Sequence, residues 1–423
     1  MKFRLTIQRC LVTGVLAIMC WNVPRASAQM AIDIEEPPIK YSDTKDDNVV
    51  SRLIDRLNSG DLKLDYDRSH GYLKSVLREL NISESSQVLV FSKTSMQVRY
   101  ISKRNPRAIY FNDNTYVGWV RGSSIMEIST DDPKLGAAFY TVEMKPWKAD
   151  VQRADYDCLS CHATSMTQGI PGHTVRSVMP NVDGSIDSQL LSYVTDHSSP
   201  LEQRWGGWYV TGRHGDAKHM GNAVLRGGKL HTDRSSNLLS LREEFESFDW
   251  LTPYSDIVAL MVLEHQTQMY NTMVRANFTV RKHRHDQLDD QELTVLIQQA
   301  AEPVVDYMLF CDEAALDEPV KGSVVFATEF TSRGLQDDQQ RSLRDFDLQT
   351  KLFRYPCSYL IHSSSFDALD ESLRAEIYRQ LADVLTGKNN ASKYKHLDEP
   401  TRKAIIEILR SKKSDLADDW AKS

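Results

Sequence analysis

The sequence predicts an α+β protein whose first part is rich in strands, whose centre is rich in loops and whose last part is mainly helical. Short runs of β-branched and aromatic residues, separated by Asn, Asp, Gly and Pro, follow one another between residues 88 and 142. Residues 151–250 combine aromatic residues with many turn-forming residues. After residue 255, apolar residues recur at helical spacing.

Each predicted element follows from the spacing of its apolar residues. Two helices are predicted at 49–57 and 72–80. Strands are predicted at 88–91, 98–101, 108–111, 116–120, 125–128 and 137–142. Helices are then predicted at 255–277, 290–309, 366–386 and 399–411.

Length and composition indicate an ordinary globular protein with more than one domain. The chain has 423 residues, of which 41% are hydrophobic and 26% are charged. These values exclude collagen-like, coiled-coil and wholly disordered proteins, and the length exceeds what one small electron carrier needs. The predicted organisation after residue 47 is a strand-rich α/β domain at 48–150, a central segment at 151–250 and a helical domain at 251–423.

The first 28 residues have the features of a secretory signal peptide. Lys2, Arg4 and Arg9 precede a mostly apolar stretch, and Ala26-Ser27-Ala28 provides the small residues of a cleavage site. Cleavage after Ala28 predicts export to the periplasm. A lipid anchor on Cys20 is the less favoured alternative, because Met19 occupies the position where a small residue is needed. Residues 29–47 then form an acidic segment that we expect to be mobile.

The charge of the processed chain argues against nucleic acid as a partner. Loss of the signal peptide removes four basic residues and no acidic ones, which takes the formal net charge from −7 to −11. Such a chain lacks the basic surface that binds phosphate backbones. After the signal peptide, no apolar stretch approaches the roughly 18 residues of a membrane span.

The clearest motif is Cys158-Leu159-Ser160-Cys161-His162, one C-x-x-C-H sequence in the middle of the chain. In this pattern, typical of c-type haem attachment, two thiols bind the two vinyl groups of one haem and the adjacent histidine is the proximal iron ligand. The motif therefore predicts one covalent haem c, attached through Cys158 and Cys161, with His162 below the iron.

Three other chemistries use closely spaced cysteines. They are a structural disulfide, a redox-active thioredoxin-like pair and half of a zinc site. A zinc ribbon needs a second close pair of ligands, and no second C-x-x-C is present. A thioredoxin-like pair is expected near the start of a βαβ domain, whereas this motif lies in mid-chain. Haem attachment is the favoured interpretation.

At this motif the sequence resembles c-type cytochromes. A wider resemblance joins it to large exported monohaem proteins with one central C-x-x-C-H motif. The segments that carry this resemblance are Asn105–Asp113, Arg204–Gly212, His219–Asn222 and Arg354–Tyr359. The resemblance implies haem binding and electron transfer, and we expect a redox partner protein; it names no substrate.

Histidines cluster around the motif, and several residues could supply the sixth iron ligand. Six of the twelve histidines lie between residues 158 and 231. The distal candidates, in order, are His219, His265 and Met220, with His214, Trp205 and Trp208 as further pocket residues. A hydrogen-bonded loop histidine is an equal alternative for His219, and a core histidine is the more common role for one on an apolar helix face such as His265.

Two functional classes stay open. Two protein ligands on the iron predict a periplasmic electron-transfer protein, whereas an open sixth position predicts a peroxidase-like haem oxidoreductase or a ligand sensor. The remaining cysteines, Cys311 and Cys357, could form a disulfide between helical segments or stay as two buried thiols.

Overall fold

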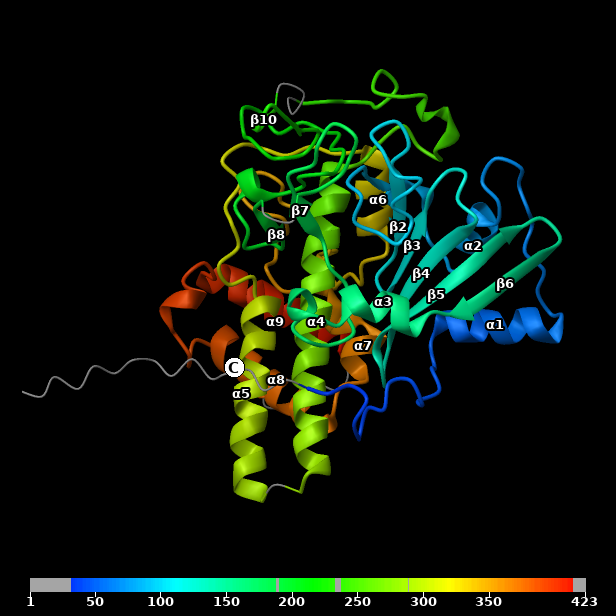
Figure 1. Cartoon of the computed structure of the whole chain (residues 1–423). Helices are drawn as coiled ribbons and strands as arrows, with labels where there is room; N and C mark the ends of the chain where they lie inside the picture. The colour runs from blue at the N-terminus through cyan, green and yellow to red at the C-terminus, as the bar shows by residue number, and fades with distance from the viewer. Residues whose placement is uncertain (1–31, 188–189, 233–236, 288, 414–423) are drawn as a thin grey trace, which may run out of the picture. The chain divides into compact units, whose positions relative to one another are not determined.

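Six antiparallel strands form one sheet in which every strand pairs with its neighbours in sequence (Figure 1). The computed structural model describes residues 32–187, 190–232, 237–287 and 289–413. The strands are β1 (Val88–Val90), β2 (Arg107–Phe111), β3 (Thr115–Trp119), β4 (Ile125–Asp132), β5 (Gly136–Lys145) and β6 (Lys148–Arg153). The sheet lies in the N-terminal half and most helices lie in the C-terminal half, so the predicted α+β class is confirmed.

The two faces of the sheet differ because side chains alternate along each strand. One row across the sheet joins Tyr110, Val117, Ile128 and Tyr140, all of which are buried. This face contacts the start of α1 (Val49–Ser59), where Asn48 donates a hydrogen bond of 2.8 Å to the Tyr140 hydroxyl. The opposite face carries the cavity described below.

The helical part is built around α4, the longest helix (Figure 1). Asp256 begins it by accepting a hydrogen bond of 2.9 Å from the Ala259 amide, as a capping side chain does. α4 packs against α5, α6 and α8, and α8 packs against α5 and α9. The bounds after α1 are α2 (Leu73–Glu79), α3 (Asp155–His162), α4 (Ile257–His285), α5 (Asp290–Met308), α6 (Val324–Ser332), α7 (Ser364–Asp367), α8 (Glu371–Leu385) and α9 (Glu399–Lys412).

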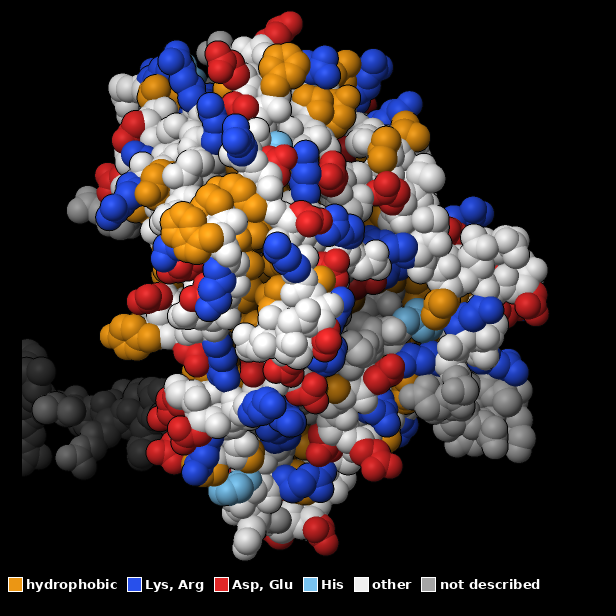
Figure 2. Space-filling model, turned by 90° about the vertical axis from the view of Figure 1, so that its right-hand side faces the viewer, with side chains coloured by type: hydrophobic (Ala, Val, Ile, Leu, Met, Phe, Trp, Pro, Cys, Tyr) orange, Lys and Arg blue, Asp and Glu red, His pale blue; other side chains and the backbone are white. Residues whose placement is uncertain are grey.

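Two short hairpins lie in the central segment, which is otherwise mostly loops and turns. Their strands are β7 (Arg176–Val178) with β8 (Ser192–Val194), and β9 (Val224–Arg226) with β10 (Lys229–His231). Among the described residues, no helix combines the length and the apolar character that crossing a membrane requires. The face drawn in Figure 2 mixes basic and acidic side chains and has no continuous basic surface.

Most predicted elements are present, and the differences have physical reasons. The strand predicted at 98–101 is wrong: this segment is a turn, in which the Tyr100 amide donates to the Gln97 carbonyl over 3.0 Å. The helix predicted at 366–386 is divided into α7 and α8, because Asp370 caps a new helix start. β6 was not predicted because its sequence, Lys-Ala-Asp-Val-Gln-Arg, is mostly polar, and it crosses the boundary predicted at residue 150.

The predicted signal peptide lies outside the described residues. The described part of the acidic segment, which begins at Ile32, contacts the sheet. The Tyr41 side chain is fully buried, and its hydroxyl donates to the Ala137 carbonyl over 2.8 Å. Arg153 donates to the Tyr41 carbonyl over 2.8 Å. Tyr41 therefore anchors this segment to the sheet.

Candidate functional site

Helix α3 places the three residues of the C-x-x-C-H motif on one face. Cys158, Cys161 and His162 stand at positions i, i+3 and i+4, which lie on the same side of an α-helix. Asp155 and Asp157 occupy the first turn, where negative charge stabilises the helix dipole. The helix has no buried residue, and both cysteines are free thiols, Cys158 partly buried and Cys161 exposed. The structural disulfide considered for this pair is not formed in this structure.

The His162 ring is held through one nitrogen. Its Nδ1 donates a hydrogen bond to the Gly172 carbonyl over 2.9 Å, and the Gly172 amide donates back to the His162 carbonyl over 2.9 Å. Nε2 therefore carries the lone pair in the neutral ring. Although the His162 side chain is only partly buried by exposed area, desolvation of its ring lowers the pKa to about 4, so the ring is neutral at pH 7. A neutral imidazole with its Nδ1 hydrogen bonded to a carbonyl is the usual arrangement of a metal-binding histidine.

A cavity of about 470 Å³ lies next to this face of α3. Its volume is within the range of pockets that hold small molecules and cofactors. The second face of the sheet forms one wall, because strand register brings alternate residues of β2 to β5 to the same side. The wall residues are Arg107, Ile109, Tyr116, Gly118, Glu127, Ser129 and Phe139.

A charged pair crosses this wall beside the thiols. Arg107 on β2 and Glu127 on β4 form an ion pair across Gly118 on β3. A Cβ at Gly118 would lie 2.3 Å from the Arg107 guanidinium, so glycine provides the space for this contact. Burial, with a smaller contribution from Glu127, raises the pKa of Cys158 to about 12. The Cys158 thiol is therefore protonated at pH 7.

Helix α4 forms another wall of the cavity. Leu263 and Thr267 line it one turn apart, and Asn271 follows after a further turn. The Asn271 side chain accepts from the His173 amide over 3.0 Å and donates to the His173 carbonyl over 2.6 Å. A Cβ at Gly172 would lie 2.2 Å from Asn271 Oδ1. The segment that holds His162 is thus fixed to α4 by contacts that only glycine permits.

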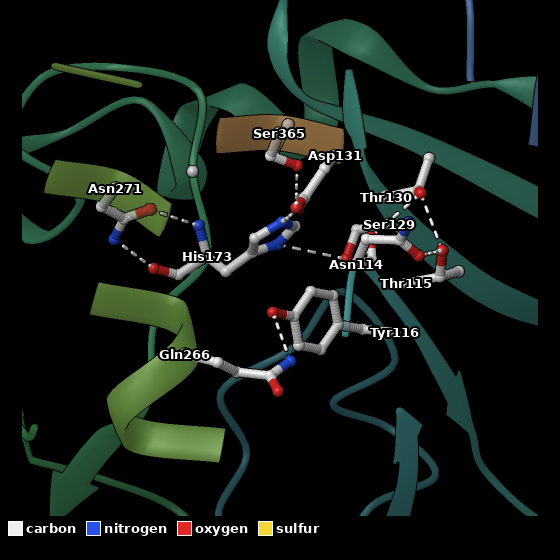
Figure 3. Close-up of polar contacts among 12 residues, drawn as sticks. Asn114, Thr115, Tyr116, Ser129, Thr130, Asp131, His173, Gln266, Asn271 and Ser365 are labelled. Atoms are coloured by element: carbon white, nitrogen blue, oxygen red, sulfur yellow. Dashed lines mark hydrogen bonds and ion pairs between the residues drawn. The ribbon is translucent and has the colours of Figure 1, made fainter. Parts of the chain in front are cut away.

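His173 also lines the cavity, but both of its ring nitrogens have partners (Figure 3). Nε2 lies 3.2 Å from Asp131 Oδ1, and Nδ1 lies 3.4 Å from the Ser129 hydroxyl. Ser365 donates to the other oxygen of Asp131 over 2.9 Å. Burial lowers the pKa of His173 to about 3 and raises that of Asp131. The network joins the sheet, α4 and α7 behind the cavity.

Comparison with known proteins adds no further assignment. No family model, curated protein or solved structure matches this chain. In the part of the chain that the structure describes, no group of three or more His, Cys, Asp or Glu side chains is arranged to hold a metal ion. The site is therefore interpreted from its own residues.

The structure brings some of the predicted site residues together and separates others. Cys158, Cys161, His162 and Trp208 line the cavity. The distal candidates and the other two predicted pocket residues are absent from its described lining, namely His219, His265, Met220, His214 and Trp205.

The two neighbouring distal candidates pack in the interior. His219 is buried against Trp205 and His214, with ring centroids 5.4 and 4.6 Å away. The Met220 sulfur accepts a hydrogen bond from Ser177 over 3.6 Å. The glycine-rich aromatic segment thus folds as a packed loop. Of the pocket residues predicted in this segment, Trp208 lines the cavity.

His265 belongs to a buried stack of rings. Its Nδ1 lies 2.9 Å from Nδ1 of His197, and its Nε2 lies 2.8 Å from the Ser358 hydroxyl. The rings of Tyr307 and Phe310 stack on it, with centroids 5.5 and 4.3 Å away. Burial, together with His197, lowers its pKa well below the usual value.

Several cavity residues were not identified from the sequence. Glu127 lies in a predicted strand and Arg107 directly precedes one, but their pairing depends on strand register, which the sequence pattern did not provide. His173 was counted in the histidine cluster without a role. Met96 and Arg176 carried no motif, although both line the cavity.

The last two cysteines are buried free thiols, one of the two alternatives that the sequence left open. Burial raises the pKa of both Cys311 and Cys357 to about 12. Both thiols are therefore protonated at pH 7 and poorly reactive.

Proposed function

We propose that the protein binds one haem covalently through Cys158 and Cys161, with His162 as the proximal iron ligand, and that it transfers electrons outside the cytoplasm. One observation carries the proposal: two free thiols and a neutral imidazole face one cavity from a single turn of α3. The Nδ1 contact to Gly172 orients the imidazole and leaves the Nε2 lone pair for a metal.

The cavity walls fit a flat, largely apolar macrocycle. Phe139, Ile109 and Leu263 provide apolar surface, and the Trp208 ring lines the same space. When bound, haem supplies an iron that cycles between the ferric and ferrous states. The protein contributes the two thiols, the orientation of His162 and exclusion of water by α4 and the sheet.

The position of α3 supports exchange of electrons with a partner protein. Cys161 is exposed and the helix has no buried residue, so a macrocycle attached here would have one edge close to the surface. Electron transfer between proteins requires such a short path from cofactor to surface. Export follows from the proposed signal peptide and agrees with attachment of haem outside the cytoplasm.

A second candidate function is binding of a small ligand at an open sixth iron position. It is favoured by the location of His219, His265 and Met220 outside the cavity lining and by the engagement of both His173 nitrogens. Met96 lies in the described lining and is 48% exposed, and its sulfur could instead be the sixth ligand. A ligand sensor or a peroxidase-like enzyme needs the open position, whereas a simple carrier needs a sixth protein ligand.

Two measurements test these proposals on protein exported by a host that attaches haem. The intact mass must include one haem that survives denaturation; a mass equal to the bare polypeptide would refute covalent attachment. Spectra of the ferrous protein with and without carbon monoxide then separate the two functions. A low-spin spectrum unchanged by carbon monoxide supports electron transfer, and a shifted spectrum supports the open position.

A further inference from the structure

Four buried side-chain atoms in the cavity lining have no hydrogen-bond partner among the described residues. Nε of Arg107 and Oε2 of Glu127 belong to the ion pair described above, and the other two atoms are Nε of Arg176 and the hydroxyl oxygen of Thr174. Buried polar atoms are nearly always paired in a folded protein, so an unpaired pair that lines one cavity indicates a missing ligand. Both groups can donate hydrogen bonds, which points to a ligand with acceptor oxygens.

Unlike Arg107 and Lys93, the other two cations in the described cavity lining, Arg176 has no carboxylate partner in the described part of the chain. Arg107 pairs with Glu127, Lys93 with Asp183 and Arg204 with Glu264. The Arg176 contact that positions its side chain is a hydrogen bond of 3.0 Å from Nη2 to the neutral Ser192 hydroxyl. Its positive charge is therefore available to an anionic group in the cavity.

Arg176 lies in the chain segment that also holds His162. Gly172, whose carbonyl accepts from His162, precedes Arg176 by four residues, a reach of at most about 14 Å, and residues 173–176 line the cavity. The Arg176 end is fixed, because Trp208 Nε1 donates to the Arg176 carbonyl over 2.7 Å. The cavity lining thus combines the two thiols of α3 with a cation that has no carboxylate partner among the described residues.

We infer that Arg176, assisted by Thr174, forms a carboxylate subsite that binds the propionates of the cofactor. This inference rests on the proposed haem site. The propionates of haem lie on the side of the ring away from its vinyl groups, so vinyl groups attached at α3 would leave the carboxylates to a separate polar subsite, and Arg176 is the cation in the described lining that has no carboxylate partner. A guanidinium binds carboxylates through paired hydrogen bonds, which makes Arg176 a residue that selects and orients the macrocycle.

The experiment uses a full-length chain carrying Cys158→Ser and Cys161→Ser, in which haem binding is reversible. Its affinities for haemin and for haemin dimethyl ester, which lacks carboxylates, are measured by absorption titration. Both titrations are repeated on the same chain with Arg176→Gln added. They are also repeated with Arg99→Gln added as a control, since Arg99 is exposed and outside the described lining. Circular dichroism checks the fold of each variant.

We expect haemin to bind at least about tenfold more tightly than its ester when Arg176 is present, the usual worth of a charge-assisted hydrogen bond. Arg176→Gln should reduce this preference to less than about threefold, and Arg99→Gln should preserve it. Equal affinity for the two ligands with Arg176 present overturns the subsite, even if Arg176→Gln does not fold. Binding of neither ligand overturns the proposed haem site itself, and the subsite with it.

Discussion

His162 and His265 occupy opposite environments in the same molecule. His162 has one ring nitrogen fixed by a carbonyl and lines a cavity beside two thiols. His265 has both nitrogens occupied and lies in a stack of rings with His197, Tyr307 and Phe310. Both rings are neutral at pH 7, since burial lowers the pKa of each. Access of one nitrogen to a cavity, rather than burial, distinguishes the candidate ligand from the structural histidine.

The largest expected effect is loss of attached haem in Cys161→Ala. One thiol is removed, so the two thioether bonds that hold the macrocycle cannot both form. We expect the stable two-bond product to be absent when the denatured protein is analysed by haem staining and mass spectrometry. Cys311→Ala is the matched control, because it removes a buried thiol elsewhere. A normally attached haem in Cys161→Ala would make the central assignment wrong.

His162→Ala tests whether His162, which lines the cavity, is the proximal iron ligand. Removing the proximal imidazole should shift the haem absorption bands and the reduction potential, because the iron loses an axial ligand. Addition of free imidazole should restore much of the original spectrum by occupying the vacated space. An unchanged spectrum in the variant without imidazole would exclude His162 as the ligand.

His265→Ala tests whether His265 is a structural residue of the interior. Loss of a fully buried ring that stacks on Phe310 should lower the free energy of unfolding by about 3–5 kcal/mol, as for other large-to-small core substitutions. Urea unfolding followed by circular dichroism measures this change. The absorption spectrum of bound haem should stay that of the unsubstituted protein. A variant with normal stability and an altered haem spectrum would reverse the roles given to the two histidines.

The smallest expected effect concerns Glu264, the neighbour of His265 on α4. Burial raises the pKa of Glu264 to about 7, against the opposing effect of Arg204, whose Nη1 lies 3.3 Å away. The folded state thus binds this proton more tightly than the unfolded state, where the pKa is about 4.3. Its contribution to stability is complete below pH 4.3 and is lost as the pH rises through 7.

Glu264→Gln should remove the part of the stability that depends on protonation of Glu264. As the pH rises from 4.5 to 7, loss of the Glu264 proton should lower the unfolding free energy of the unsubstituted protein by up to about 3 kcal/mol. The variant has no such proton to lose, so its unfolding free energy should decrease by that much less. Urea titrations at the two pH values measure the difference. Glu202→Gln is the control, because it makes the same substitution at an exposed glutamate of the central segment. Identical pH dependence in both variants would contradict a raised Glu264 pKa.

The sequence was sufficient for the fold class and for the motif at α3, but not for the cavity around it. Strands 108–111, 116–120 and 137–142 follow from local patterns of β-branched and aromatic residues, and all are present. Arg107, Gly118 and Glu127 meet only through strand register, a relation between segments that no local pattern contains. The charged composition of β6 likewise concealed a strand at the edge of the sheet.

The distal candidates show a second limit. His219 and Met220 follow a glycine-rich aromatic segment that could cover a macrocycle, but its aromatic rings pack with His219 in the interior. His265 lies on an apolar helix face, as the sequence indicated, and partners from the C-terminal half fill that face. Spacing along one helix identifies the face that is buried, but it does not identify what the face contacts.

The construction of the cavity has a consequence for the order of folding. The sheet wall is a meander of strands joined to their sequence neighbours, so its contacts close short loops and are expected to form early. Contacts to α4 span long loops: Gln266 reaches Tyr116 across 150 residues, and Asn271 reaches His173 across 98. During folding of a chain that emerges N-terminus first, we therefore expect an interval in which the sheet and α3 are formed while the α4 side is open, which gives a bulky cofactor time to enter before the helix docks.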